Sequence, residues 1–190
     1  MSESPISQFP LAELEGLDAD IRQRIEAVQE KAGFVPNIFL ALAHRPDEFR
    51  AFFAYHDALM DKPSSLTAGE KEMIVVATSG LNQCLYCVVA HGAILRIREK
   101  SSTLSDQLAT NYRRAALSQR QRLMLDYAVK VATRSQEICE ADRQLLQDEG
   151  FSIEDIWEIG AIAAFFAMSN RLANMSALQP NPEFYGMGRL

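Results

Sequence analysis

The sequence has few cysteines, few histidines and no long apolar run. Its three cysteines are an odd number and two of them are almost adjacent, which does not fit the disulfide framework of a small extracellular domain. The longest strongly apolar stretch, IGAIAAFFAM, is far shorter than the ~20 residues that span a bilayer. The opening residues, MSESPISQFP, lack the basic region and apolar core of a secretory signal. We therefore expect a soluble cytoplasmic protein without a membrane partner.

Excess basic charge is also missing. The formal net charge is -6, and the basic clusters at 96–98 and 113–114 lie among acidic residues. The sequence shows no basic stripe with interleaved aromatic residues, so nucleic acid is not an expected partner. Nearly half of the 190 residues are apolar, which is ordinary for a globular domain that buries roughly 70% of its unfolded surface.

Alternation of apolar and polar residues with period two never persists, whereas apolar residues recur at helical spacing throughout. We therefore predict an all-α bundle of about seven or eight helices, formed by residues 18–178. An extended arm, 1–17, precedes it and an irregular tail, 179–190, follows it. The expected helices cover 18–31, a short stretch after Pro36, 46–60, 68–79, 84–99, 118–134, 140–149 and a long segment after Ser152.

The chemistry is concentrated in NQCLYCVVAHG, where Cys84, Cys87 and His91 fall within eight positions. On a helix, residues three or four apart share a face, so all three side chains are expected to point one way. Cys84 lies near the predicted helix start, where free N–H groups and the helix dipole stabilise a thiolate. His91 lies one turn beyond Cys87 and is placed to accept its proton. This pattern favours a reactive dithiol.

Two other interpretations of the pair stay open. Free cysteine is often only a small buried side chain, so the spacing can be coincidence. Two cysteines and a histidine are also zinc ligands, but structural zinc sites usually draw on a second Cys/His pair. His44, His56 and Cys139 each lack a close partner in the sequence. We therefore expect no metal at this position.

The wider pattern E-x11-C-x2-C-x3-H joins Glu72 to the cysteines and His91. Together with GFVPNIF at 33–39 and NRLAN at 170–174, it resembles the alkylhydroperoxidase D-like superfamily, which shares its fold with carboxymuconolactone decarboxylases. The resemblance is to the peroxidase-related branch and extends from about residue 20 to 178. It implies an all-helical fold with the dithiol at a helix start.

The resemblance also implies an activity, reduction of hydrogen peroxide or organic hydroperoxides without haem, flavin or metal. In such proteins the second cysteine, here Cys87, attacks the peroxide, and the first, here Cys84, resolves the sulfenic acid to a disulfide. The histidine, His91, is the base or proton relay, and the glutamate, Glu72, orients it. Electrons then come from a reducing dithiol protein, such as a lipoyl-bearing one, or from a small thiol. Family members assemble into homo-oligomers.

Three alternatives to a peroxidase remain. They are a general dithiol–disulfide oxidoreductase, a decarboxylase-type lyase on the same fold, and a non-catalytic redox-responsive or zinc-binding oligomer. The residues themselves add one conflict, because the helix start favours Cys84 as nucleophile whereas proximity to His91 favours Cys87. We follow the resemblance and assign the attack to Cys87. Some family members carry histidine between the cysteines, where this chain has Tyr86, a poor proton relay with its ordinary pKa near ~10.

The remaining candidates have simpler expected roles. Glu70, three residues after Thr67, is expected to cap a helix. Asn170 and Asn174 can line the site, but a solvated helix face is the simpler interpretation. His56 is expected to be a satisfied core or boundary residue, and Cys139 and Trp157 are expected to be packed side chains.

Overall fold

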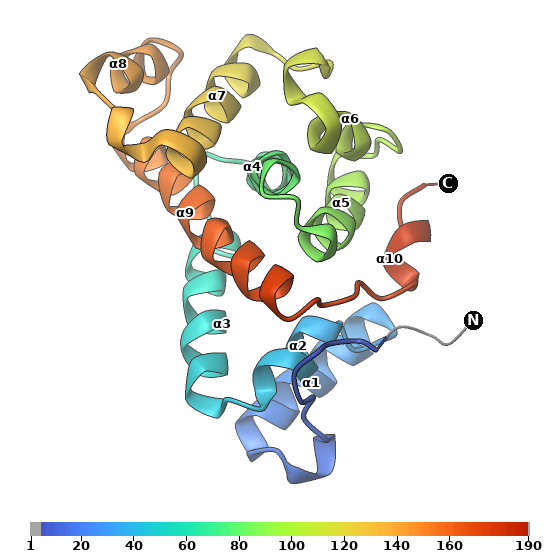
Figure 1. Ribbon diagram of the computed structural model, residues 1–190. Coiled ribbons are helices and arrows are strands. Elements are labelled where there is room, and N and C mark those ends of the chain that lie inside the picture. Colours follow the sequence, from blue (N-terminus) through green and yellow to red (C-terminus); the bar gives the residue numbers. More distant parts are fainter. Residues whose placement is uncertain (1–4, 190) are drawn as a thin grey trace.

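The computed structural model describes residues 5–189. Within them the regular structure is entirely helical and contains no strand (Figure 1). The predicted all-α class is therefore confirmed. The helices are α1 (Ala19–Ala32), α2 (Asn37–Ala43), α3 (Pro46–Met60), α4 (Ala68–Leu81), α5 (Leu85–Glu99), α6 (Leu104–Asn111), α7 (Gln119–Arg134), α8 (Glu140–Asp148), α9 (Ile153–Met175) and the single turn α10 (Glu183–Gly186). Short 3-10 turns cover Leu14–Gly16, Tyr112–Arg114 and Ser135–Glu137. The sequence pattern does not predict α6, which lies in a polar stretch, or the single turn α10.

Capping residues fix most of the helix starts. The Thr67 hydroxyl accepts the Glu70 N–H at 3.0 Å, and the Glu70 carboxylate accepts the Thr67 N–H at 2.9 Å, as the sequence predicts. Ser152 forms the same reciprocal pair at the start of α9. Asp18 precedes α1 but does not cap it, because its carboxylate instead pairs with Arg50 at 2.6 Å.

The core is built around α4, which Figure 1 shows end-on with α5, α6, α7 and α9 around it. Every residue from Gly69 to Ser79 is buried. Gly80 allows the backbone of α6 to approach closely, because a Cβ there would lie 2.5 Å from the Ala109 carbonyl oxygen. A helix buried on all sides holds its side chains in fixed positions, which matters for Glu72 and Ser79 below.

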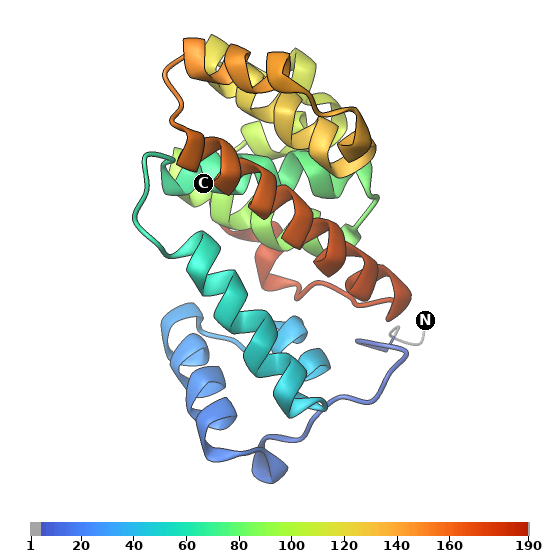
Figure 2. The ribbon, with the colours of Figure 1, turned by 90° about the vertical axis from the view of Figure 1, so that its left-hand side faces the viewer.

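The first three helices form a second layer beneath this bundle (Figure 2). Within this layer α2 contacts α3 through phenyl rings. The rings of Phe39 and Phe53 stack with centroids 4.3 Å apart, and the centroid of the Phe49 ring lies 4.6 Å from that of Phe53. Phe52 of α3 reaches Phe165 of α9 at 4.9 Å and so joins the two layers. The α3 helix therefore lies against the same part of α9 that supports the site.

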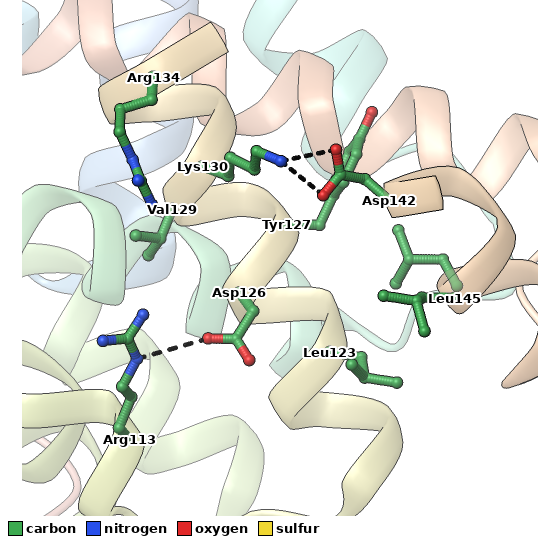
Figure 3. A pocket seen from close by; sticks show the side chains of 10 residues that line it. Arg113, Leu123, Asp126, Tyr127, Val129, Lys130, Arg134, Asp142 and Leu145 are labelled. Atoms are coloured by element: carbon green, nitrogen blue, oxygen red, sulfur yellow. Dashed lines mark hydrogen bonds and ion pairs between the residues drawn. The ribbon is translucent and has the colours of Figure 1, made fainter. Parts of the chain in front are cut away.

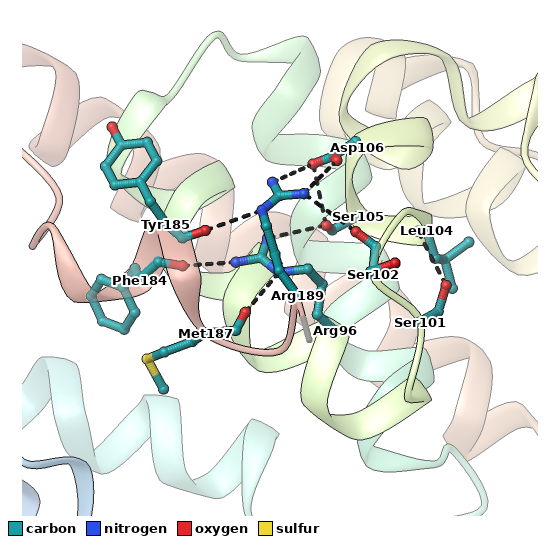
Figure 4. Close-up of polar contacts among 10 residues, drawn as sticks. All are labelled: Arg96, Ser101, Ser102, Leu104, Ser105, Asp106, Phe184, Tyr185, Met187 and Arg189. Carbon is teal, nitrogen blue, oxygen red and sulfur yellow. Dashed lines mark hydrogen bonds and ion pairs between the residues drawn. The ribbon is translucent and has the colours of Figure 1, made fainter.

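Both ends of the described chain lie on the bundle. The N-terminal arm pairs with the segment after α9, through Gln8 N–H to Ser176 O at 2.8 Å and Gln179 N–H to Ile6 O at 2.9 Å. The C-terminal tail is not irregular throughout, because it contains α10 and is held by the buried Arg96 guanidinium (Figure 4). Arg96 donates to the carbonyl oxygens of Phe184 at 2.7 Å and Met187 at 2.8 Å.

Two expectations about packing are wrong. Trp157 is 76% exposed, because the inward face of α9 is taken by its neighbours Ile156 and Ile159. Cys139 is exposed at the start of α8. No helix within residues 5–189 has the length and apolar character needed to cross a membrane.

Candidate active site at the start of α5

The turn between α4 and α5 places Cys84 at a helix N-terminus. Asn82 ends α4, and Gln83 adopts the left-handed conformation with φ of 52°, which reverses the chain within two residues. The Cys84 N–H then donates to the Ser79 carbonyl oxygen at 3.0 Å. Cys84 becomes the residue that caps α5, and its side chain points at the free N–H groups of the first turn.

The Cys84 sulfur acts as the capping acceptor. It accepts the Cys87 N–H at 3.4 Å and is fully buried. The thiol hydrogen bond from Cys87 contributes most to stabilising the thiolate, followed by that N–H and by Asn170 and His91. Together they outweigh burial and lower the pKa of Cys84 to about 7. At neutral pH this sulfur is therefore a thiolate in a large share of molecules.

Cys87 behaves in the opposite way. Its hydrogen bond to Cys84 and its burial raise the pKa of the Cys87 thiol well above its ordinary value. The two sulfurs thus share one proton, which rests on Cys87 while Cys84 carries the charge. The electrostatics favour Cys84 as the first thiolate, in agreement with its position at the helix start and against the attacking role that the resemblance gives Cys87.

An imidazole–carboxylate pair lies beside the dithiol. His91 Nδ1 is 2.8 Å from Glu72 Oε2, and both side chains are largely buried. Because an ionised carboxylate only accepts hydrogen bonds, Nδ1 carries the hydrogen and Nε2 is left as the basic nitrogen. The Phe166 ring supports the imidazole edge-on at 4.8 Å. The structure therefore brings together the four residues Glu72, Cys84, Cys87 and His91 that the motif joins.

Asn170 is a member of the site that sequence reasoning placed on a solvated face. It is 1% exposed, accepts from Asn82 Nδ2 at 2.9 Å and donates to Ser79 Oγ at 2.9 Å. Its hydrogen bonding also lowers the pKa of Cys84. The signal in the sequence was NRLAN itself, whose first residue comes soon after the apolar stretch IGAIAAFFAM on the same helix. Asn174 is exposed, as expected, and donates to the Asn82 carbonyl oxygen at 3.1 Å.

Tyr86, the residue between the cysteines, supports the structure and does not face the reacting atoms. Its hydroxyl accepts the Ile38 N–H at 3.2 Å, which ties α5 to α2. Burial raises the pKa of Tyr86 far above neutrality. This phenol is therefore fixed as a neutral group and is not a proton relay.

Other parts of the molecule offer less chemistry. A pocket of about 240 Å³ lies between α7 and α8, where Lys130 pairs with Asp142 at 2.7 Å and Arg113 lies 3.7 Å from Asp126 (Figure 3). Its charges satisfy one another, and neither cysteine nor histidine lines it. Within the described residues, no group of three or more His, Cys, Asp or Glu side chains is arranged to hold a metal ion.

Comparison with known proteins identifies the family of the chain. A family model described as the carboxymuconolactone decarboxylase family matches residues 46–103, which include α3, α4 and α5. No match is found among curated proteins.

Solved structures show the same fold over the full length. An uncharacterized peroxidase-related protein from Ralstonia eutropha JMP134, an alkylhydroperoxidase AhpD core, is 63% identical over 99% of each chain with a TM-score of 0.98. A peroxidase-related protein from Silicibacter sp. TM1040 is 40% identical over 100% of this chain and 99% of its own, with a TM-score of 0.93. The debrominase Bmp8, as a cysteine-to-alanine variant in complex with 2,3,4-tribromopyrrole, shares the fold at 19% identity over 97% and 96% of the chains, with a TM-score of 0.75.

Proposed function

The chain belongs to the alkylhydroperoxidase D-like and carboxymuconolactone decarboxylase superfamily, in its peroxidase-related branch, and we propose that it is a thiol peroxidase. It reduces hydrogen peroxide or organic hydroperoxides through a dithiol–disulfide cycle of Cys84 and Cys87. The observation that carries the proposal is the capping thiolate of Cys84, hydrogen-bonded to Cys87 and adjacent to the His91–Glu72 pair. The cycle needs neither a metal nor an organic cofactor.

The first half of the cycle breaks the peroxide O–O bond. The Cys84 thiolate attacks the terminal oxygen, a sulfur–oxygen bond forms, and the alkoxide leaves with the electron pair of the O–O bond. The alkoxide takes a proton that His91 has received at Nε2 from solvent, while the Nδ1–H of His91 stays hydrogen-bonded to Glu72. The products are the sulfenic acid of Cys84 and an alcohol, or water when the substrate is hydrogen peroxide.

The second half closes the disulfide. The Cys87 thiol gives its proton to His91 and attacks the sulfenic sulfur, so the S–S bond forms and hydroxide leaves as water. Residues i and i+3 on a helix are near enough for this bond after a small rearrangement. An external dithiol then reduces the bridge by exchange, supplies both electrons and both protons, and leaves as its own disulfide. A reducing dithiol protein, such as a lipoyl-bearing one, or a small thiol fills this role.

Replacing each cysteine tests this proposal. Cys84→Ser and Cys87→Ser should each abolish peroxide consumption with dihydrolipoamide as reductant, whereas Cys139→Ser, which removes the exposed third thiol, should keep it. Full turnover in Cys87→Ser would refute the dithiol cycle. Trapping the sulfenic acid with dimedone and locating it by mass spectrometry decides the order of attack. If dimedone labels Cys87 in the Cys84→Ser variant but does not label Cys84 in the Cys87→Ser variant, then Cys87 makes the first attack.

A second candidate is a dithiol–disulfide oxidoreductase whose oxidant is not a peroxide. It is favoured by the burial of both cysteines, which are 0% and 2% exposed. This burial limits the access of large hydroperoxides to the sulfurs. Oxidation of the pair by small disulfides but not by hydrogen peroxide would select it. Substrate conversion that survives loss of both cysteines would instead indicate a decarboxylase-type lyase, and stoichiometric zinc that blocks thiol labelling would indicate a metal-binding protein.

A further inference from the structure

A second histidine, His56 of α3, packs against the same phenyl ring as His91. The imidazole centroids of His56 and His91 lie 6.3 Å and 4.8 Å from the centroid of Phe166, and both rings meet it edge-on. Phe165 also contacts His56, at 6.1 Å. His56 is thus a boundary residue, as the sequence suggests, but the boundary it occupies is that of the dithiol site.

His56 is held in the same tautomer as His91. Its Nδ1 is 3.2 Å from Asp57 Oδ1, and Asp57 is fixed by two hydrogen bonds of 2.8 Å from the Arg24 guanidinium. Because the Asp57 carboxylate can only accept, His56 Nδ1 carries the hydrogen and Nε2 is the basic nitrogen. The protein therefore fixes two imidazoles by carboxylates, and each presents Nε2 as a base.

Two of the charged groups that act on His56, His91 and Glu72, belong to the site. Burial lowers the pKa of His56, and His91 of α5 lowers it further, whereas Asp57 of its own helix and Glu72 of α4 raise it. The Arg24 guanidinium of α1 acts through Asp57, and α9 contributes only aromatic rings. His56 is consequently neutral at pH 7, able to accept a proton, and sensitive to the charge of the Glu72–His91 pair.

Exposure increases from the carboxylate outward. The side chains of Glu72, His91 and His56 are 9%, 13% and 25% exposed. Tyr86 is not an alternative route, because its hydroxyl is bonded to α2 and stays protonated. His56 is therefore the more exposed of the two imidazoles that pack on Phe166.

We infer that His56 is a proton-relay residue, which passes protons between the Glu72–His91 pair and solvent. It does not touch the sulfurs and acts through His91. The inference rests on the proposed function, because a resting Cys84 thiolate has already released its proton to solvent. The alkoxide that leaves during peroxide reduction must receive a proton in return. A second imidazole at the rim of the site supplies it without opening the apolar surroundings of the sulfurs.

The experiment compares His56→Asn with His44→Asn by stopped-flow peroxide reduction from pH 5 to 9. Asparagine keeps a donor for Asp57 but has no titrating nitrogen, and His44 offers a matched control because its Nδ1 also bonds a fixed oxygen, Ala41 O at 2.6 Å. His56→Asn should slow oxidation about tenfold, less than the roughly 10²–10⁴-fold of a direct general acid or base because His56 acts through His91, and should alter the pH profile. His44→Asn should leave both unchanged. A His56→Asn rate and profile equal to those of the wild type would overturn the inference.

Chemical rescue separates a proton relay from a packing role. In His56→Ala, added imidazoles of graded pKa should restore the rate in proportion to their basicity, whereas cavity filling alone would give equal rescue by all of them. Equal rescue, or none in a variant that melts like the wild type, would refute the relay. If the wild-type protein reduces no peroxide, the proposed function itself fails. If the wild-type protein reduces peroxide and His56→Asn reduces it equally fast, only the relay is refuted.

Discussion

Two helices of this protein begin at a cysteine, yet only one of these cysteines is in a reactive arrangement. Cys84 precedes α5 and Cys139 precedes α8. The Cys84 sulfur is buried and accepts the N–H of a second cysteine, whereas Cys139 is exposed. A helix start alone therefore does not give a cysteine the buried, hydrogen-bonded surroundings of Cys84.

The two helix starts differ in whether an acidic side chain is present to interact with the N-terminal end of the helix dipole. The first turn of α8 carries Glu140 and Asp142, and the Asp142 carboxylate accepts the Cys139 N–H at 2.8 Å. The first turn of α5 has no acidic residue, so the Cys84 sulfur is the group there that can carry a negative charge stabilised by the helix dipole. Burial beside His91 and Asn170 then completes an environment that α8 lacks.

The largest expected effect comes from removing the carboxylate of Glu72, which is hydrogen-bonded to His91. Glu72→Gln leaves His91 without a fixed tautomer and should lower peroxide turnover by roughly 10²-fold, within the range for general acid–base catalysis. Glu70→Gln is the matched control, because Glu70 is also buried on α4 but pairs with Arg120. Steady-state peroxide consumption measures both, and equal activity of Glu72→Gln and the wild type would contradict the assignment.

The second prediction concerns pH. The pKa of Cys84 is lowered to about 7, so the thiolate is present above that pH and is lost as pH falls through it. The rate of alkylation at Cys84 by iodoacetamide should therefore rise with a midpoint near 7 and fall about tenfold per unit below it. Peptide mapping after short pulses distinguishes this site from Cys139. A midpoint near the ~8.5 of a free thiol would show that the capping arrangement has no electrostatic effect.

Asn170 provides a third test, because it joins three segments of the site. Asn170→Ala leaves Ser79 and Asn82 without their buried partner and should lower the free energy of unfolding by about 1–3 kcal/mol. It should also shift the alkylation midpoint of Cys84 upward. Urea unfolding and the alkylation assay measure the two effects, and Asn174→Ala, at an exposed position, should change both less. An unchanged midpoint would remove Asn170 from the site.

The smallest effect sharpens the comparison of the two helix starts directly. Leu85 is 51% exposed at the first position of α5, and Leu85→Glu gives α5 an acid in its first turn, as α8 has. The added carboxylate competes for the dipole, which is worth about 0.3–1 kcal/mol at an exposed position. The alkylation midpoint should rise by less than one pH unit, while Leu85→Gln should leave it unchanged. A fall in the midpoint would contradict this account.

Much of the fold was predictable because it follows from local rules. The helices after Thr67, Ser118 and Ser152 begin where short polar side chains cap them, and α1 ends at Gly33, whose φ of 85° favours glycine. The extra helix α6 was missed because its eight residues contain a single repeat of the helical spacing, from Leu104 to Leu108. Trp157 was misplaced because α9 is apolar nearly all round, so its sequence does not indicate which face is covered.

The sequence by itself determined which residues can react, because the spacing of Cys84, Cys87 and His91 along one helix follows from 3.6 residues per turn. Only the tertiary structure decided which groups surround these side chains and how those groups alter their pKa values. Glu72 lies on the preceding helix, α4, and Asn170 on the distant helix α9, and their contacts with the site arise from the packing of these helices against one another. The lowered pKa of Cys84 and the position of His56 beside Phe166 depend on desolvation and on distances between helices, which no local pattern encodes.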